Sequence, residues 1–217
     1  MGRIRWMIYR MKQNGHLPIV TLVMFVLNVA CFIWEVTQGN TLRVDNPVTL
    51  KFDMLQGSIE VGGWYRVFTH AFFHYGILHI ACNMFCLWMY GLSLETRIGS
   101  IRYLIIYVVA IIGSGLLINF FGGKGVHHAG ASGAVWGLMA AMLIYCIRNK
   151  LDFTYALRGI VFNLIYSFTA GGVSWQGHIG GGIAGLIAAL ILCTNRPNRR
   201  LREFRRAYEK GVRNQQQ

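Results

Sequence analysis

The sequence predicts an all-α membrane protein with six transmembrane helices. Hydrophobic residues make up 54% of the 217 residues and charged residues only 13%, about half the charged share of a soluble domain. Several uncharged runs approach or exceed the roughly 20 residues that a helix needs to cross a bilayer. Lysines and arginines gather in alternate connections between these runs, as the positive-inside rule expects of a chain with several spans.

The first predicted span covers residues 17–36 and follows a basic segment, residues 1–16, that suits the headgroup region. The run is long for a signal peptide, and no small-residue cleavage site closes it, so we expect an uncleaved helix. Glu35 is expected at its outer end, within reach of water. The connection over 37–66 is long, and connections of this length usually have a function.

The other spans are expected in apolar runs with few or no charges, over residues 67–94, 103–121, 131–147, 160–169 and 176–193. The uncharged stretch 159–195 is too long for one crossing at about 1.5 Å per residue. The sequence Ala170-Gly171-Gly172 provides a break within it, which gives a short fifth span and a sixth. The fifth span can extend back through Tyr155.

The positive charges predict the topology. Of the 21 Lys and Arg, 17 lie in the two tails and in the turns after the second and fourth spans, which places both termini in the cytoplasm. The formal net charge of +13 therefore does not indicate nucleic-acid binding, because its tail residues lie beside anionic lipid headgroups. We expect a basic interfacial segment (1–16), a six-span domain (17–195) and a basic cytoplasmic tail (196–217).

Two polar side chains in apolar runs carry the functional prediction. Ser132 begins the fourth span and His178 lies near the start of the sixth, where ionisable groups are costly and usually functional. A serine nucleophile needs a base, and histidine suits that role at neutral pH. Small residues at intervals of four would let the two helices touch; they are Gly133, Gly137, Gly177, Gly181 and Gly185. Such glycines often serve packing alone, but each set here adjoins a polar residue that packing does not need.

The predicted pair has no acidic third member. All eight Asp and Glu residues lie at span ends, in loops or in the tail, so we expect a Ser132–His178 dyad whose imidazole is held by packing. Trp136 lies four residues after Ser132 on the same helix face and could stack on His178.

Acyl transfer also needs donors for a developing oxyanion. His79 and Asn83 project from one face of the second span, and the backbone N–H of Ser132 is a third candidate. An interhelical hydrogen bond is the structural alternative for Asn83. We expect His70 and His74 nearer to water, where they would keep a cavity wet.

No metal or cofactor is expected. The five cysteines lie in apolar runs, without the spacing of a metal site or of a disulfide framework. A metalloprotease would need an HExxH-like helix or a carboxylate ligand at depth, and the sequence contains neither near its histidines.

These motifs together resemble the rhomboid family of intramembrane serine proteases. The matching elements are Gly130-Ala131-Ser132-Gly133, His79 with Asn83, and Gly177-His178 with its glycines. Further matches are Tyr65-Arg66 with Phe68-Thr69-His70, and Glu95-x-Arg97 with Gly99. The likeness covers roughly residues 15–195. Trp136 departs from it, because many bacterial members have tyrosine there, and His127 and His128 fit no family pattern.

The resemblance implies a rhomboid-like bundle in the minimal six-helix form, with a long membrane-embedded first loop that contains Arg66. It implies that Ser132 is the nucleophile, His178 the general base, and Asn83 with His79 the oxyanion site. It also implies transmembrane protein substrates that enter beside the fifth helix, in a bacterial inner membrane.

Two other classes of protein stay open as alternatives. A rhomboid-like pseudoprotease binds membrane clients without cutting them, but such relatives typically lack the serine or the histidine. A polytopic transporter also has polar groups in its spans, but it would leave the surroundings of Ser132 without a purpose. The sequence does not specify an oligomeric state.

Overall fold

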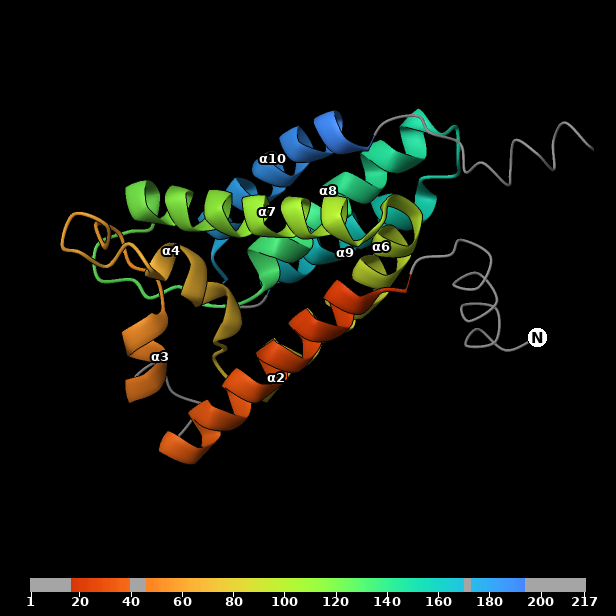
Figure 1. Cartoon of the computed structure of the whole chain (residues 1–217). Coiled ribbons are helices and arrows are strands. Elements are labelled where there is room, and N and C mark those ends of the chain that lie inside the picture. Colours follow the sequence, from red (N-terminus) through yellow and green to blue (C-terminus); the bar gives the residue numbers. More distant parts are fainter. Residues whose placement is uncertain (1–16, 40–45, 170–172, 194–217) are drawn as a thin grey trace, which may run out of the picture.

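The described part of the chain is helical, with one isolated β-bridge between Met54 and His128 (Figure 1). The computed structural model describes residues 17–39, 46–169 and 173–193. The predicted interfacial segment and the predicted tail lie outside the described residues.

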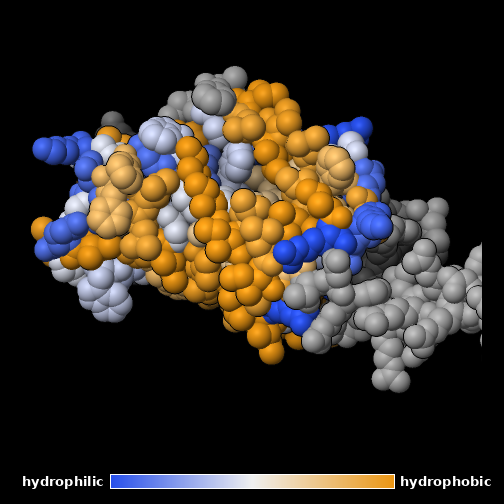
Figure 2. All heavy atoms as spheres, turned by 90° about the horizontal axis from the view of Figure 1, so that it is seen from above, coloured by the Kyte–Doolittle hydropathy of each residue, from blue (hydrophilic) through white to orange (hydrophobic). Residues whose placement is uncertain are grey.

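Six long apolar helices or helical runs correspond to the six predicted spans, which confirms the predicted fold class. They are α2 (Ile19–Gln38), the continuous run α5–η2–α6 (Ile77–Ile98), α7 (Ser100–Phe121), α8 (Ser132–Arg148), α9 (Thr154–Thr169) and α10 (Trp175–Leu192). Four of them have the length and apolar character to cross a membrane, and α8 and α9 are shorter apolar helices. One face of the molecule is apolar across its middle and hydrophilic toward both ends (Figure 2), as a bilayer-spanning protein requires.

The structure locates the second span within the apolar run 67–94, and it extends the fifth span back past Tyr155, as the sequence allowed. The second span begins at Ile77 rather than at residue 67, because the chain turns at Gly76, whose φ of 94° suits glycine. The preceding residues instead form α4 (Arg66–Thr69) and η1 (His70–Phe72). The fifth span begins at Thr154, and it includes an exposed arginine whose long side chain can extend from the helix toward water.

Glycines bring α10 against α7 and α8. A Cβ atom on Gly181 would fall within the backbone of Gly133, and one on Gly185 within the backbone of Gly137. On the neighbouring face, a Cβ on Gly180 would meet the backbone of α7 at Gly113. The three helices therefore approach as closely as their backbones allow, which is how helices gain packing energy in lipid.

We expect Gly181→Ala to destabilise the protein by about 1–3 kcal/mol, the usual cost of overpacking a tight contact. Gly182→Ala is the matched control, because a Cβ there would meet only the Trp136 Cβ, at 4.0 Å. Thermal unfolding of the two variants in detergent measures the difference. Equal unfolding temperatures would contradict the proposed role of the close contact.

Two buried carboxylates attach α2 to the rest of the bundle. Glu95, on α6 (Leu92–Ile98), accepts hydrogen bonds from the backbone N–H groups of Val20 and Thr21 at 2.9 and 2.7 Å. It thus caps the positive N-terminal end of α2. At the other end of α2, Glu35 is fully buried and accepts from Thr49 Oγ1 at 2.5 Å and from the His74 N–H at 3.2 Å. The expectation that water reaches Glu35 is wrong, because the first loop folds over it.

The first loop packs beside one end of α7 (Figure 1). It contains α3 (Pro47–Phe52) and α4, and the Asn46 side chain caps α3 by accepting from Val48 and Thr49 N–H groups. The Arg66 guanidinium donates to the backbone oxygens of Leu50 and Asp53 at 2.9 and 2.8 Å. This arginine therefore holds the loop in a closed conformation.

Candidate active site

Ser132 is the first residue of α8, where the loop 122–131 enters the bundle. Gly130 has a φ of 125°, a conformation that favours glycine. A Cβ on Gly130 would lie 2.8 Å from the His79 ring and 3.5 Å from Asn83 Nδ2. The glycine thus lets the backbone just before Ser132 lie against both of these side chains.

His79 and Asn83 both come from α5 (Ile77–Cys86). Asn83 is buried, and its Nδ2 donates to the His79 backbone oxygen at 3.1 Å. The His79 Nδ1 accepts from the Tyr75 N–H at 3.3 Å. Among the described residues, the bond that the Asn83 amide makes thus stays within α5.

His178 is 7% exposed and is held from two sides. Its ring stacks on Trp136, with centroids 5.4 Å apart and planes at 28°. Its Nδ1 lies 3.1 Å from Ser167 Oγ on α9. Because Ser167 donates its own hydroxyl hydrogen to the Asn163 oxygen at 2.7 Å, it accepts from His178. The hydrogen of a neutral His178 is therefore assigned to Nδ1, which leaves Nε2 as an acceptor.

The segments that carry Ser132 and His178 are in contact. A Cβ on Gly133 would lie 3.1 Å from the Gly177 oxygen. Gly133 directly follows Ser132 and Gly177 directly precedes His178, so the two helices meet beside both proposed catalytic residues. Trp136, one turn further along α8, stacks on His178. Among the described residues the hydrogen bonds of His178 do not include a direct one to Ser132.

His70 and His74 are buried, 2% and 1% exposed, so the expectation that they lie near water is wrong. Burial lowers the pKa of His70 to about 4, and burial together with His79 lowers that of His74 well below its usual value. The neutral His74 accepts at Nε2 from the Ala131 N–H at 3.3 Å. It therefore supports the backbone beside Ser132, a contact that no sequence signal indicated.

A buried carboxylate joins the first loop to the loop before Ser132. The fully buried Asp53 is paired with Arg66 Nη1 at 3.0 Å and with His127 Nδ1 at 2.7 Å, and it accepts from Tyr75 OH at 3.0 Å. Burial raises the pKa of Asp53, and His127 is the main group that opposes this shift. The neighbouring His128 contacts the Gly122 oxygen at 2.8 Å through Nε2. His127 and His128, which fit no family pattern, thus both hold the loop before Ser132 in place.

Within the described residues, no three His, Cys, Asp or Glu side chains are grouped as a metal site would require. The chemistry that this arrangement supports is nucleophilic catalysis. A serine stands at the mouth of α8, an imidazole with an acceptor nitrogen lies on the adjoining helix, and amide and imidazole groups lie against the preceding loop.

Comparison with known proteins identifies the family. Residues 61–195 match the family model of the Rhomboid domain. The chain is 35% identical over 187 residues to Rhomboid protease GluP of Bacillus subtilis, covering 83% of this chain and 36% of that protein. It is 33% identical over 155 residues to RHOMBOID-like protein 6, mitochondrial, of Arabidopsis thaliana, covering 69% of this chain and 50% of that protein. It is 32% identical over 134 residues to Rhomboid protease GlpG of Salmonella choleraesuis, covering 58% of this chain and 48% of that protein.

The chain spans half or less of the length of these relatives. The matched segment includes the second to sixth spans and every predicted site residue. The chain belongs to the rhomboid family.

Proposed function

We propose that this chain is an intramembrane serine endopeptidase that cleaves transmembrane segments of other membrane proteins with a Ser132–His178 dyad. The main support is the contact between α8 and α10, which pairs Gly133 with Gly177 and stacks Trp136 on His178. The named rhomboid proteases among its relatives support the same activity.

The proposed reaction begins when Ser132 Oγ attacks the scissile carbonyl carbon and its proton passes to His178 Nε2. The imidazolium then gives this proton to the departing amine nitrogen, which leaves an acyl-enzyme on Ser132. Water hydrolyses the ester by the same steps, with His178 again as the base. The Ser167 hydroxyl favours the His178 tautomer that these reaction steps need, because it accepts a hydrogen bond from His178 Nδ1. Catalytic hydrogen bonds are often long before substrate binds, so a direct Ser132–His178 bond is expected to form with substrate in place.

The oxyanion site proposed for this reaction consists of Asn83, His79 and the Ser132 N–H. We expect Asn83→Ala to lower kcat by about 10²–10³, the usual effect of losing one oxyanion donor, with a small change in KM. The Asn83 amide could leave its weak bond to the His79 oxygen when a stronger acceptor develops.

The matched control for this prediction is Asn149→Ala, at the far end of α8, where the amide donates to the Tyr145 oxygen at 2.8 Å. Cleavage kinetics on a fluorogenic transmembrane peptide measure both variants. An Asn83→Ala enzyme as fast as the Asn149→Ala enzyme would return Asn83 to a purely structural role.

The chain is an integral membrane protein of the rhomboid family. We propose that it lies in a bacterial inner membrane with both termini in the cytoplasm, as the distribution of Lys and Arg favours. The Ser132 end of α8 then faces outward. The division into a basic segment, a six-span domain and a basic tail belongs to the same proposal.

A serine-directed fluorophosphonate probe tests the activity without knowledge of the substrate. In membranes, the parent should be labelled on the peptide that contains Ser132, and Ser132→Ala should not be labelled. Ser93→Ala, at the opposite end of the bundle, should be labelled like the parent. A parent that binds transmembrane peptides but takes no label would instead be a pseudoprotease.

A further inference from the structure

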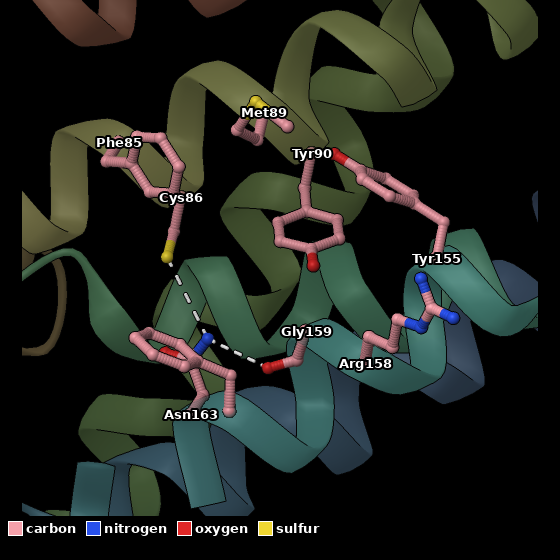
Figure 3. A pocket seen from close by; sticks show the side chains of 9 residues that line it. Phe85, Cys86, Met89, Tyr90, Tyr155, Arg158, Gly159 and Asn163 are labelled. Atoms are coloured by element: carbon pink, nitrogen blue, oxygen red, sulfur yellow. Dashed lines mark hydrogen bonds between the residues drawn. The ribbon is translucent and has the colours of Figure 1, made fainter.

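A cavity opens on the side of the bundle between α9 and the second span (Figure 3). Its volume is about 240 Å³, below the roughly 300–1,000 Å³ of typical ligand pockets, so a ligand would enter it only in part. The apolar part of the wall includes Phe85, Met89 and Phe162. Phe85 and Phe162 are 63% and 61% exposed on the molecule, so they face the lipid.

The other part of the wall is polar and basic. Arg158 and Tyr155 lie together at one end of the cavity, with Tyr90 between them and the apolar end (Figure 3). The rings of Tyr90 and Tyr155 are 5.1 Å apart, and Gly159 lets α9 lie directly against the Tyr90 hydroxyl. The floor is closed by Asn163, whose amide donates to the Gly159 oxygen at 3.0 Å.

The Arg158 charge is available to a ligand. Both ion pairs found among the described residues involve Asp53, far from this cavity in the fold. The carboxylate that interacts electrostatically with Arg158 is Asp152, and it already accepts from Thr154 N and Oγ1 at 2.8 and 2.5 Å. Arg158 itself is exposed.

The basic end of the cavity lies away from the proposed dyad, whereas Asn163 at its other end contacts Ser167. Ser167 contacts His178, and Arg158 comes nine residues earlier on α9, about 13 Å along a helix axis at 1.5 Å per residue. Its basic end therefore adjoins the turn between α8 and α9, which the charge distribution assigns to the cytoplasmic surface. Its apolar end points toward the middle of the membrane.

We propose that this cavity binds one anionic phospholipid of the adjoining leaflet. The phosphate would be held by Arg158, whose planar guanidinium suits phosphate, and by the Tyr155 hydroxyl, a residue type typical of the membrane interface. One acyl chain would lie along Phe85, Met89 and Phe162. Basic pockets between helices at the cytoplasmic side have the chemistry that acidic headgroups require.

Photo-crosslinking in phosphatidylcholine nanodiscs tests the proposal. The full chain is mixed with small equal amounts of two diazirine-acyl probes, one phosphatidylglycerol and one phosphatidylcholine, and labelled peptides are identified by mass spectrometry. We expect the segments 85–90 and 155–163 to prefer the anionic probe by roughly fivefold, the factor that one basic residue provides near such a headgroup. Arg158→Gln should remove this preference, and Arg158→Lys should retain part of it.

The matched control is Lys150→Gln, which removes one positive charge from the same turn but not from the cavity wall. It should leave the preference unchanged. Met89→Trp, which fills the apolar part, should lower labelling of both segments while Arg158 remains. Equal labelling by the two probes in the parent would overturn the proposal. The proposal would also be overturned if Lys150→Gln lost as much of the preference for the anionic probe as Arg158→Gln. Diffuse surface charge would then explain the preference.

The proposed lipid site does not depend on proteolysis. Ser132→Ala protein should give the same labelling pattern as the parent, so failure of the proposed activity and failure of the lipid proposal are separate results. Thermal unfolding checks that each variant is folded.

Discussion

Ser132→Ala is expected to lower the cleavage rate of a transmembrane substrate by on the order of 10⁶, the loss seen when a serine protease loses its nucleophile. Alanine removes the attacking oxygen and leaves α8 able to form, because Ser132 is only its first residue. Membrane insertion and thermal unfolding should therefore stay close to those of the parent. The rate is measured on a reconstituted transmembrane peptide and compared with an enzyme-free sample.

His178→Ala should cause a loss of the same size, and the double variant Ser132→Ala, His178→Ala should be no slower than either single variant. Residues that act as one unit are strongly non-additive, so this result would distinguish a dyad from two independent contributions. Full activity of either single variant would refute its assigned role. Losses that multiply in the double variant would show that the two side chains do not act together.

Asp53→Ala is expected to lower the stability by about 3 kcal/mol, the lower end of the cost of breaking a buried ion pair. Asp53 is fully buried and bound to Arg66, His127 and Tyr75. Arg66 and His127 keep partial access to water, with 19% and 27% of their side chains exposed, which moderates the cost. Because His127 lies on the loop that leads to Ser132, we expect a loss of cleavage as well.

Asp53→Asn should be intermediate, since it keeps the shape and an acceptor oxygen but loses the charge. The control is Asp152→Asn, in an exposed turn, where changes usually stay within about 0.5 kcal/mol. Thermal unfolding in detergent and cleavage kinetics measure all three variants. If Asp53→Ala unfolded at the temperature of Asp152→Asn, the first loop would not depend on this carboxylate.

Hydropathy and charge predicted most of the architecture. The third, fourth and sixth spans begin and end within a few residues of α7, α8 and α10, because lipid requires a long apolar run in each crossing helix. The second span is the exception, since the apolar run from residue 67 continues through α4 and η1. Burial within protein and burial in lipid favour the same residue types, so composition could not separate these two environments.

The contacts around the proposed site could be predicted only where one helix determines them. The four-residue spacing from Ser132 to Trp136 and the glycine intervals follow from helix geometry, and they indicated which faces of the fourth and sixth spans would meet. The hydroxyl of Ser167 at His178 gave no such signal, because its approach depends on how α9 packs beside α10.

The amino-acid sequence by itself determined the number of spans, their apolar faces and the family, since these depend on composition, helical period and local motifs. Only the tertiary structure decided the surroundings of the buried polar side chains. Glu35, His74 and Asp53 were expected at the surface or had no assigned role, and each bonds to residues far away in the chain. A buried polar group needs a partner, but which partner it meets depends on the packing of whole segments, and no local pattern encodes that.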